Sequence, residues 1–303
     1  MVSSTAVIEM KQKVTGSLSL VAATIIWGFA FIAQSVGMDR IGPFTFQAAR
    51  CLLAVLVLFP ASFLLEGKSG IRASWQKWRD KRLWKSGLLC GMCLFVAASL
   101  QQIGLVYTNA GKAGFLTAMY IVLVPIFGIF LGRKVSKSAL FSVLMAVMGL
   151  YLLSCAGVDQ INVGDLCLMG CALGFTVQIL CIDRVAQGLD GVRLNCIQAL
   201  TVVVLSIPFA AVTETIVVSD LLACWESLCF AGILSMGLAY TLQIQAQKKL
   251  DPTAASLLMS LESVFAALGG WWILGERMTP AELLGCGLVF AAVILSQLPE
   301  RKA

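Results

Sequence analysis

Arg50 and Glu262 are the two charged residues that stand well inside long apolar stretches of this sequence. A charge at the centre of a bilayer is costly, about 2.5–3.5 kcal/mol for arginine on the insertion scale, so such residues usually serve a function. A guanidinium suits a carboxylate or phosphate group, because it offers paired hydrogen bonds. A carboxylate inside a membrane can carry a proton. The pair therefore predicts a site for a polar small molecule, with Glu262 as the acid available for proton coupling.

The relation between these two charges is left open by the sequence. Arg50 lies ~10 Å from the outer end of its apolar stretch, and Glu262 lies ~14 Å from the inner end of its own. In a core of ~30 Å their depths differ by only ~6 Å. They could form an ion pair, or each could contact the substrate. Alternatively, Arg50 extends outward to the headgroups and Glu262 bonds to neighbouring backbone or hydroxyl groups.

Glutamine and tyrosine side chains recur in the same apolar stretches. Each must find a hydrogen-bond partner, because the bilayer core supplies no water. A bond between two helices would explain any one glutamine, but so many together predict a wet central pocket. The residues expected to line it and bind the substrate are Gln34, Arg50, Gln101, Gln102, Tyr120, Gln178, Gln198, Tyr240, Gln243 and Glu262.

The elements that must position these residues are membrane-spanning helices. The chain is 59% hydrophobic and 13% charged, against ~25% charged in soluble domains. Crossing the bilayer takes about 20 apolar residues. Ten segments qualify: 16–37, 43–65, 86–107, 113–132, 138–157, 165–182, 193–213, 222–246, 253–274 and 281–298. The predicted fold is an all-α integral membrane protein with ten transmembrane helices.

The distribution of Lys and Arg predicts the orientation. With the N-terminus inside, eighteen of the 22 basic residues fall on the cytoplasmic side and three on the opposite side. Cytoplasmic loops carry such an excess. We therefore expect a cytoplasmic N-terminus (1–15), a cytoplasmic C-terminus (299–303) and a location in the cytoplasmic membrane.

A repeated motif divides the ten spans into two halves. FLGRKVS at Phe130–Ser136 resembles ILGERMT at Ile273–Thr279, 143 positions later, but only the first copy is followed by a basic loop. One motif on opposite sides of a bilayer indicates an inverted repeat, a common transporter architecture. Residues 16–157 and 165–298 are thus predicted to be two inverted five-helix repeats, joined by an external linker at 158–164.

Several other chemistries lack support. The chain has no histidine, its eleven cysteines lie mostly in apolar stretches, and no nucleotide-binding loop is present, so no metal or cofactor is expected. The net charge of +6 fits membrane topology and anionic lipid better than nucleic acid. The loop Glu66–Lys85 mixes three tryptophans with basic residues, which is typical of a short interfacial helix. RNA binding by this loop would rest on its charge alone.

Several motifs of this chain match one known family: Trp27-Gly28 with Phe31, Pro43 with Arg50, Ser260-Leu261-Glu262, Leu274–Pro280 and Leu284-Gly285. On these motifs the sequence resembles the EamA-type, ten-helix members of the drug/metabolite transporter superfamily over roughly residues 16–298. Where that family usually has a proline after its span-nine glutamate, this chain has Ser263. The resemblance implies two inverted five-helix repeats around a central cavity that moves small metabolites such as amino acids or sugar derivatives, often outward.

We therefore expect a non-enzymatic transporter, an exporter of small metabolites such as amino acids, that works by alternating access. Its partners would be a small-molecule substrate and the lipid bilayer, with a coupling proton or an exchange substrate as the energy source. Two alternatives remain: a polytopic membrane enzyme acting on lipid, and a non-transporting membrane assembly protein. The first would need an acid cluster or a nucleophile–base pair at the interface, which the sequence does not show.

Overall fold

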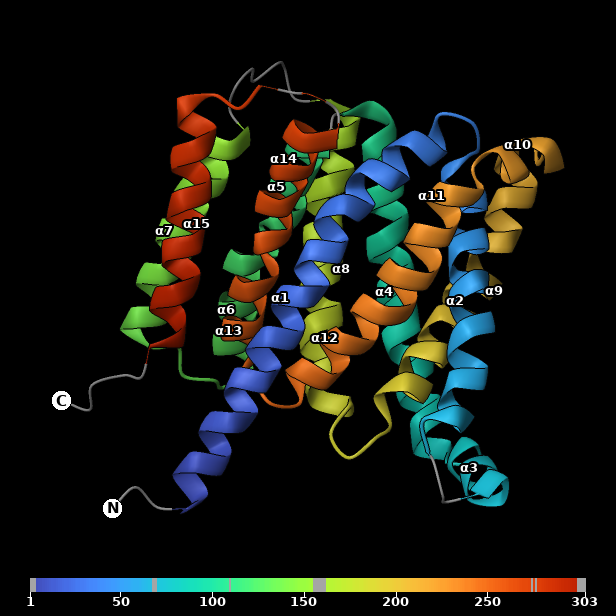
Figure 1. Cartoon of the computed structure of the whole chain (residues 1–303), viewed down its shortest axis with the longest axis horizontal. Coiled ribbons are helices and arrows are strands. Elements are labelled where there is room, and N and C mark those ends of the chain that lie inside the picture. Colours follow the sequence, from blue (N-terminus) through green and yellow to red (C-terminus); the bar gives the residue numbers. More distant parts are fainter. Residues whose placement is uncertain are drawn as a thin grey trace.

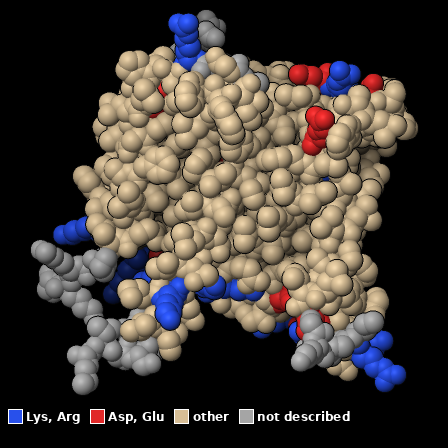
Figure 2. All heavy atoms as spheres, in the orientation of Figure 1, with Lys and Arg blue, Asp and Glu red and all other residues tan. Residues whose placement is uncertain are grey.

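The computed structural model of this chain describes residues 4–66, 70–108, 110–154, 162–273, 275 and 277–298, and the regular elements in these ranges are all helices. Within them, nine segments are long and apolar enough to cross a membrane, and Lys137–Leu153 is apolar but shorter. On the face shown in Figure 2, charged side chains gather at two opposite ends and leave a broad band without charged residues between them. The predicted all-helical membrane protein is confirmed.

Seven spans are single helices, and three are divided. The single ones are α1 (Ser4–Met38), α2 (Pro43–Leu64), α4 (Lys81–Tyr107), α7 (Lys137–Ser154), α8 (Val163–Val185), α9 (Gly191–Thr213) and α15 (Pro280–Gln297). The divided ones are α5 (Ala110–Ala118) with α6 (Tyr120–Phe130); α11 (Trp225–Cys229), the π-helix η2 (Phe230–Ala239) and α12 (Tyr240–Gln247); and α13 (Pro252–Met259) with α14 (Leu261–Ile273). Two short helices, α3 (Gly70–Trp78) and α10 (Val218–Ala223), lie between spans.

Side-chain caps explain where several helices begin. Asn162 and Asp165 form a capping box at the start of α8, and Thr279 and Glu282 form another at the start of α15. Asp251 accepts hydrogen bonds from two backbone N–H groups at the start of α13. These contacts satisfy amide donors that the first turn of a helix leaves free. The largest difference from the expected boundaries is at α1, which begins at Ser4 rather than near residue 16.

The helices pack as a bundle in which distant parts of the sequence are neighbours. α4 lies between α8 and α9, α2 packs on α9 and η2, and α1 crosses α14 and η2. At one edge of Figure 1, α7 and α15 form a separate pair. Their backbones approach closely: a Cβ at Gly149 would lie 2.7 Å from the carbonyl oxygen of Gly285. Small residues permit such close packing where no hydrophobic effect drives helices together.

The two copies of the repeated motif lie at opposite ends of the bundle. In Figure 1 the α6–α7 connection lies at the same end as the start of α1, and the α14–α15 connection lies at the other end. Both copies end a helix with a glycine of left-handed conformation, Gly132 at φ 79° and Gly275 at φ 69°. Such glycines commonly terminate helices. Leu274 and Glu276 of the second copy, residues 155–161 and the C-terminal 299–303 lie outside the described residues.

The short helix α3 occupies the loop that was expected to hold an interfacial helix. It is anchored by Arg193, which is fully buried. Arg193 Nη1 lies 3.1 Å from Glu66 Oε1 and 3.0 Å from Asp190 Oδ2. Its Nη2 donates to Ser74 Oγ on α3 at 2.6 Å. Trp78 of the same loop is buried beneath this guanidinium, whereas Trp75 and Trp84 are exposed.

Candidate functional site

The fourth span of each half is broken near its middle, and the two breaks meet. α5 ends and α6 begins around Met119, and α13 ends and α14 begins around Ser260. The spans predicted at 113–132 and 253–274 are present as Lys112–Phe130 and Pro252–Ile273. Each is interrupted at a single residue, Met119 or Ser260, whose backbone keeps right-handed helical dihedrals. Interrupted helices are tolerated in membranes where they are buried in protein or line a cavity, and transporters use them to build binding sites.

A hydrogen bond joins the two broken spans. The Tyr120 hydroxyl, on the first residue of α6, donates to Glu262 Oε1 near the start of α14 at 2.9 Å. One residue further, the Ser263 hydroxyl donates to the backbone carbonyl of Gly114 on α5 at 3.1 Å. Ser263 is the residue that stands where the resembling family usually has proline. The two halves of the molecule thus share a polar connection at the depth of the helix breaks.

A second polar group lies on α1, α2 and α4. Arg50 Nη1 donates to Gln34 Oε1 at 2.9 Å, and Gln102 Nε2 donates to the same oxygen. Gln34 Nε2 in turn donates to the carbonyl of Ala30 at 3.0 Å. Arg50 is buried, and its Nε has no hydrogen-bond partner among the described residues. The guanidinium is therefore held through Nη1 by Gln34, and its Nε–H remains an unused donor.

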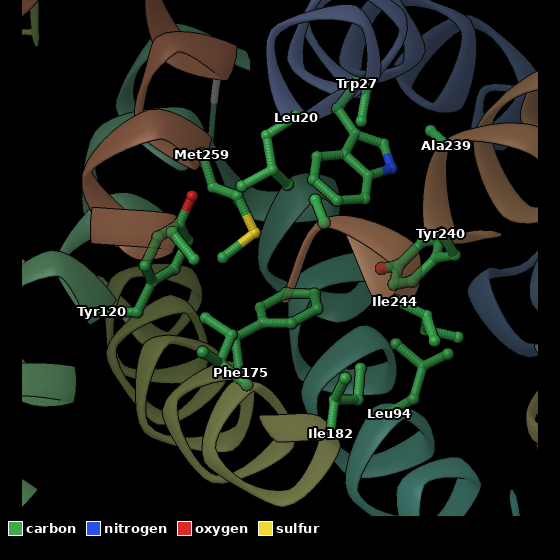
Figure 3. Packing of buried hydrophobic residues seen from close by; sticks show 14 of the residues in the cluster. Leu20, Trp27, Leu94, Tyr120, Phe175, Ile182, Ala239, Tyr240, Ile244 and Met259 are labelled. Carbon is green, nitrogen blue, oxygen red and sulfur yellow. The ribbon is translucent and has the colours of Figure 1, made fainter. Parts of the chain in front are cut away.

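Both polar groups open onto one central cavity, which is lined by residues from both halves of the chain. In Figure 3, Trp27, Tyr120, Phe175, Tyr240 and Met259 come from different helices and lie around the same central space. The Trp27 and Tyr240 rings pack edge to face with centroids 5.1 Å apart.

Seven of the ten residues predicted from the sequence line this cavity, and three do not. The seven are Gln34, Arg50, Gln101, Tyr120, Tyr240, Gln243 and Glu262. Gln102, Gln178 and Gln198 lie behind them, and each hydrogen-bonds another amide side chain. Polarity alone could not separate the two layers, because a buried amide needs a partner whether it faces a cavity or a neighbouring helix.

Six further residues line the cavity, and none of them was predicted from the sequence to belong to the site. They are Trp27, Phe31, Phe175, Ile179, Ser235 and Met259. In an apolar span, aromatic and aliphatic residues face lipid, protein or cavity without a distinguishing pattern. Two of them, Trp27 and Phe31, do belong to a motif that supported the family resemblance, and that motif was the available signal.

Arg50 and Glu262 line the same cavity without forming an ion pair. Among the described residues, the ion pairs closer than 4.0 Å join other side chains. Each of the two charged groups instead has its own neutral partner, Gln34 for the arginine and Tyr120 for the glutamate. Of the interpretations that the sequence left open, the ion pair is not present, and Glu262 bonds to a neighbouring hydroxyl as one alternative had it. Arg50 bonds to Gln34 rather than extending outward to the headgroups.

The cavity also contacts the π-helix η2 through Ser235. π-Helical turns are rare and often occur at functional sites. The side chain of Asn195 on α9 packs against the end of this π-helix, where Nδ2 donates to the carbonyls of Met236 at 2.8 Å and Gly237 at 3.0 Å. The span predicted at 222–246 is therefore present, but ten of its residues have π-helical rather than α-helical geometry.

A polar cavity between two halves of a membrane-spanning helix bundle, bordered by broken helices, is the architecture of secondary transporters. Among the described residues, His, Cys, Asp and Glu side chains form no group of three that could hold a metal ion. The sequence profile of the EamA-like transporter family matches residues 14–155 and 162–298. The chain belongs to this family, and it is a membrane transporter rather than an enzyme.

Curated relatives carry transporter names. An "Uncharacterized transporter" of Archaeoglobus fulgidus is 30% identical over 96% of this chain and 88% of its own length. The uncharacterized transporter YoaV of Bacillus subtilis is 24% identical over 92% of this chain and 95% of its own length. The threonine/homoserine exporter RhtA of Escherichia coli K12 is 32% identical over 53% of this chain and 55% of its own length.

The fold also has a solved counterpart. A structure titled only "Crystal structure of protein" superimposes with a TM-score of 0.76, at 20% sequence identity, over 93% of this chain and 96% of that chain. At this identity the likeness concerns the fold alone. It agrees with the arrangement of two five-helix repeats inferred from the sequence.

Proposed function

We propose that this transporter exports small metabolites that carry both a carboxylate and an amino group, such as amino acids and related compounds. The observation that carries the proposal is the placement of Arg50 and Glu262 in one cavity without an ion pair between them. A zwitterion brings one opposite charge for each. Neither cavity charge then needs a new partner from the protein when the substrate is bound.

The carboxylate end of the substrate would bind beside Arg50. The Nε of Arg50 and the indole Nε1 of Trp27 are both buried donors without a hydrogen-bond partner among the described residues, and both residues line the cavity. A buried donor left unsatisfied costs about 1–3 kcal/mol. A ligand that supplies two acceptor oxygens would recover that cost, and a carboxylate supplies them in the planar geometry that a guanidinium favours.

The amino end would bind at the meeting point of the broken helices. Glu262 is the acidic residue that lines the cavity, and its Oε1 accepts from Tyr120 while the carboxylate retains further acceptor capacity. The same carboxylate would serve as the proton carrier if transport is coupled to a proton gradient. Exchange against a second substrate is the alternative energy source, and it would not require Glu262 to change its protonation state.

Alternating access would operate between the two repeats. Leu20, Leu94, Ile182 and Ile244 are almost completely buried and belong to one apolar core. Ile182 and Ile244 stand in the last turns of α8 and α12, which end on the side where α1 begins (Figure 1). Packing at these two helix ends would close the cavity on the cytoplasmic side, given that both termini are cytoplasmic as the Lys and Arg distribution predicts. We place the protein in the cell membrane on the same grounds.

Transport into proteoliposomes with defined internal and external buffers tests the proposal. The substrates would be L-threonine and L-homoserine, chosen because the relative RhtA is named for them. We expect saturable flux that L-threonine analogues lacking either the carboxylate or the amino group fail to inhibit. If the analogue that lacks the carboxylate inhibits as strongly as L-threonine, a carboxylate site at Arg50 is contradicted. Absence of flux for a panel of amino acids would refute the substrate class.

A further inference from the structure

Four buried amide side chains form a continuous hydrogen-bonded chain that ends at the cavity. Gln243 Nε2 donates to Gln178 Oε1 at 3.3 Å, and Gln178 Nε2 donates to Gln198 Oε1 at 3.4 Å. Gln198 Nε2 donates to Asn195 Oδ1 at 3.3 Å. All four residues are at most 2% exposed. They come from α12, α8 and α9, so the chain runs through three helices without using a charged group.

The direction of this chain is fixed at its far end by backbone chemistry. Asn195 Nδ2 contacts the carbonyl oxygens of Met236 and Gly237 at the end of the π-helix η2. Carbonyl oxygens only accept hydrogen bonds, so the Asn195 atom that faces them must be its NH₂ group. The nearby Thr241 hydroxyl donates to Gly237 at 2.7 Å and accepts from the same NH₂ group at 3.0 Å. The two hydrogens of this NH₂ group are shared among three acceptors, and only one amide orientation of Asn195 presents donors to them.

Each following amide takes its orientation from the one before it. With its NH₂ group on η2, Asn195 presents Oδ1 to Gln198, so Gln198 must present a donor to it and its own oxygen to Gln178. Gln178 in turn must donate to Gln198 and accept from Gln243. An amide has a donor end and an acceptor end, so one fixed member orients every other member of the chain.

At the cavity this leaves Gln243 with its carbonyl oxygen unused. Gln243 lines the cavity, and its Oε1 is buried without a hydrogen-bond partner among the described residues. We propose that Asn195, Gln198 and Gln178 are positioning residues that hold Gln243 with its oxygen available to the substrate, so that this part of the wall selects a hydrogen-bond donor.

The proposal rests on the proposed function and adds a third recognition point to it. With the carboxylate at Arg50 and the amino group at Glu262, the group that meets Gln243 is on the substrate's side chain. A hydroxyl or amide there would donate to Oε1. An ether or another group that only accepts would face the oxygen of Gln243 without a hydrogen between them. A site built to pair with a substrate hydroxyl discriminates strongly against an analogue that cannot pair.

The test compares L-homoserine with O-methyl-L-homoserine, whose ether oxygen only accepts. Binding to the purified protein in detergent would be measured by isothermal titration calorimetry. We expect the wild-type protein to prefer L-homoserine by about 10- to 100-fold, the range expected when a buried acceptor loses its donor. In Gln198→Met, which interrupts the chain, the Gln178 and Gln243 amides are free to turn, and the preference should fall to about threefold or less.

Gln47 provides a matched control. It is fully buried on α2, and its amide donates to Ser99 Oγ at 3.0 Å and Ser206 Oγ at 3.1 Å, away from the cavity. Gln47→Met loses as many hydrogen bonds as a chain member but should keep the full preference for L-homoserine. General loosening of the bundle would weaken both ligands together in either variant. An unchanged preference in Gln198→Met, or an equal loss in Gln47→Met, would overturn the proposal.

A second measurement needs no substrate. Gln178→Glu places an ionisable group between Gln198 Oε1 and Gln243 Nε2, and once ionised it has no hydrogen to donate to Gln198. In Gln47→Glu the two serine hydroxyls can turn and donate to the carboxylate. Between about pH 6 and pH 9, the Tm of Gln178→Glu should therefore fall relative to that of Gln47→Glu, because ionisation removes the donor that a fixed chain requires. Parallel Tm profiles would refute the fixed direction.

The binding comparison and the Tm comparison together distinguish failure of the proposed function from failure of the positioning role. If the wild-type protein binds neither probe, L-homoserine is not a ligand, and the flux assay with the panel of amino acids decides the substrate class. The Tm comparison still decides whether the amide chain has a fixed direction. If both probes bind with equal affinity and the Tm comparison shows no difference, the positioning role fails while the transport function stands.

Discussion

Replacing Arg50 by lysine tests the carboxylate site most directly. Arg50 is 3% exposed, its Nη1 donates to Gln34 Oε1 at 2.9 Å, and its Nε has no partner among the described residues. Lysine keeps the positive charge but replaces a planar fork of donors by one flexible ammonium. A substrate carboxylate would then lose one of two charge-assisted hydrogen bonds. Such a bond contributes about 1.5–3 kcal/mol, which corresponds to about 10- to 150-fold in Kd.

The assay measures two ligands by isothermal titration calorimetry on the purified protein. L-Threonine carries the carboxylate, whereas 1-aminopropan-2-ol keeps the amino and hydroxyl groups and lacks it. We expect Arg50→Lys to weaken L-threonine binding by the factor above and to leave 1-aminopropan-2-ol binding unchanged. Arg40→Lys, a substitution at an exposed arginine just after the end of α1, serves as the control and should change neither Kd.

The difference between the two ligands carries the interpretation. A loss of the same size for both would mean that Arg50 maintains the shape of the cavity rather than binding a carboxylate. Unchanged L-threonine binding in Arg50→Lys would refute the reasoning, since a paired guanidinium–carboxylate contact cannot survive the loss of its fork.

Three further predictions concern coupling, packing and pH. Glu262→Gln removes the acid of the cavity, so transport of L-threonine into proteoliposomes should be lost or become independent of pH between about 5.5 and 8. Wild-type rates with an unchanged pH profile would exclude a coupling or binding role for Glu262. Gly149→Ala would bring a Cβ within 2.7 Å of the α15 backbone, whereas Gly287→Ala meets nothing within 4 Å. Thermal unfolding in detergent should show a loss of about 1–3 kcal/mol for the first and little change for the second, and equal stabilities would contradict the close α7–α15 contact. Finally, hydrogen bonding from Lys77 lowers the pKa of Glu66 to about 2. Because the folded state lowers this pKa, the ionised Glu66 carboxylate stabilises the fold above pH 4.5, the ordinary pKa of a glutamate, and the stabilisation is lost as the pH falls toward 2. The Tm advantage of wild type over Glu66→Gln should therefore shrink between about pH 6 and pH 3. An advantage that does not change with pH would be contrary evidence.

The sequence was sufficient for the features that depend on local composition. Long apolar stretches predict spans because every backbone group in the bilayer must bond within its own helix, and this requirement depends only on the segment itself. The repeated motif predicted two ends of the bundle for its two copies, and both copies terminate a helix through Gly132 and Gly275. Arg50 and Glu262 were found because a charge in hydrocarbon is conspicuous whatever surrounds it.

The tertiary structure decided which polar residues share the cavity. Gln101 lines the cavity. Gln102, the next residue on α4, does not line it and instead donates a hydrogen bond to Gln34. Successive residues point about 100° apart around a helix, so the rotation of α4 within the bundle decides between them, and that rotation is set by packing against other helices. For the same reason the sequence could not foresee the contact between Tyr120 and Glu262, which are 142 positions apart and meet because two broken helices cross. Composition therefore determined that this chain spans a membrane with two charges well inside its apolar stretches. The packing of its helices determined that those charges face one cavity without pairing, because only the complete bundle fixes how each helix is turned.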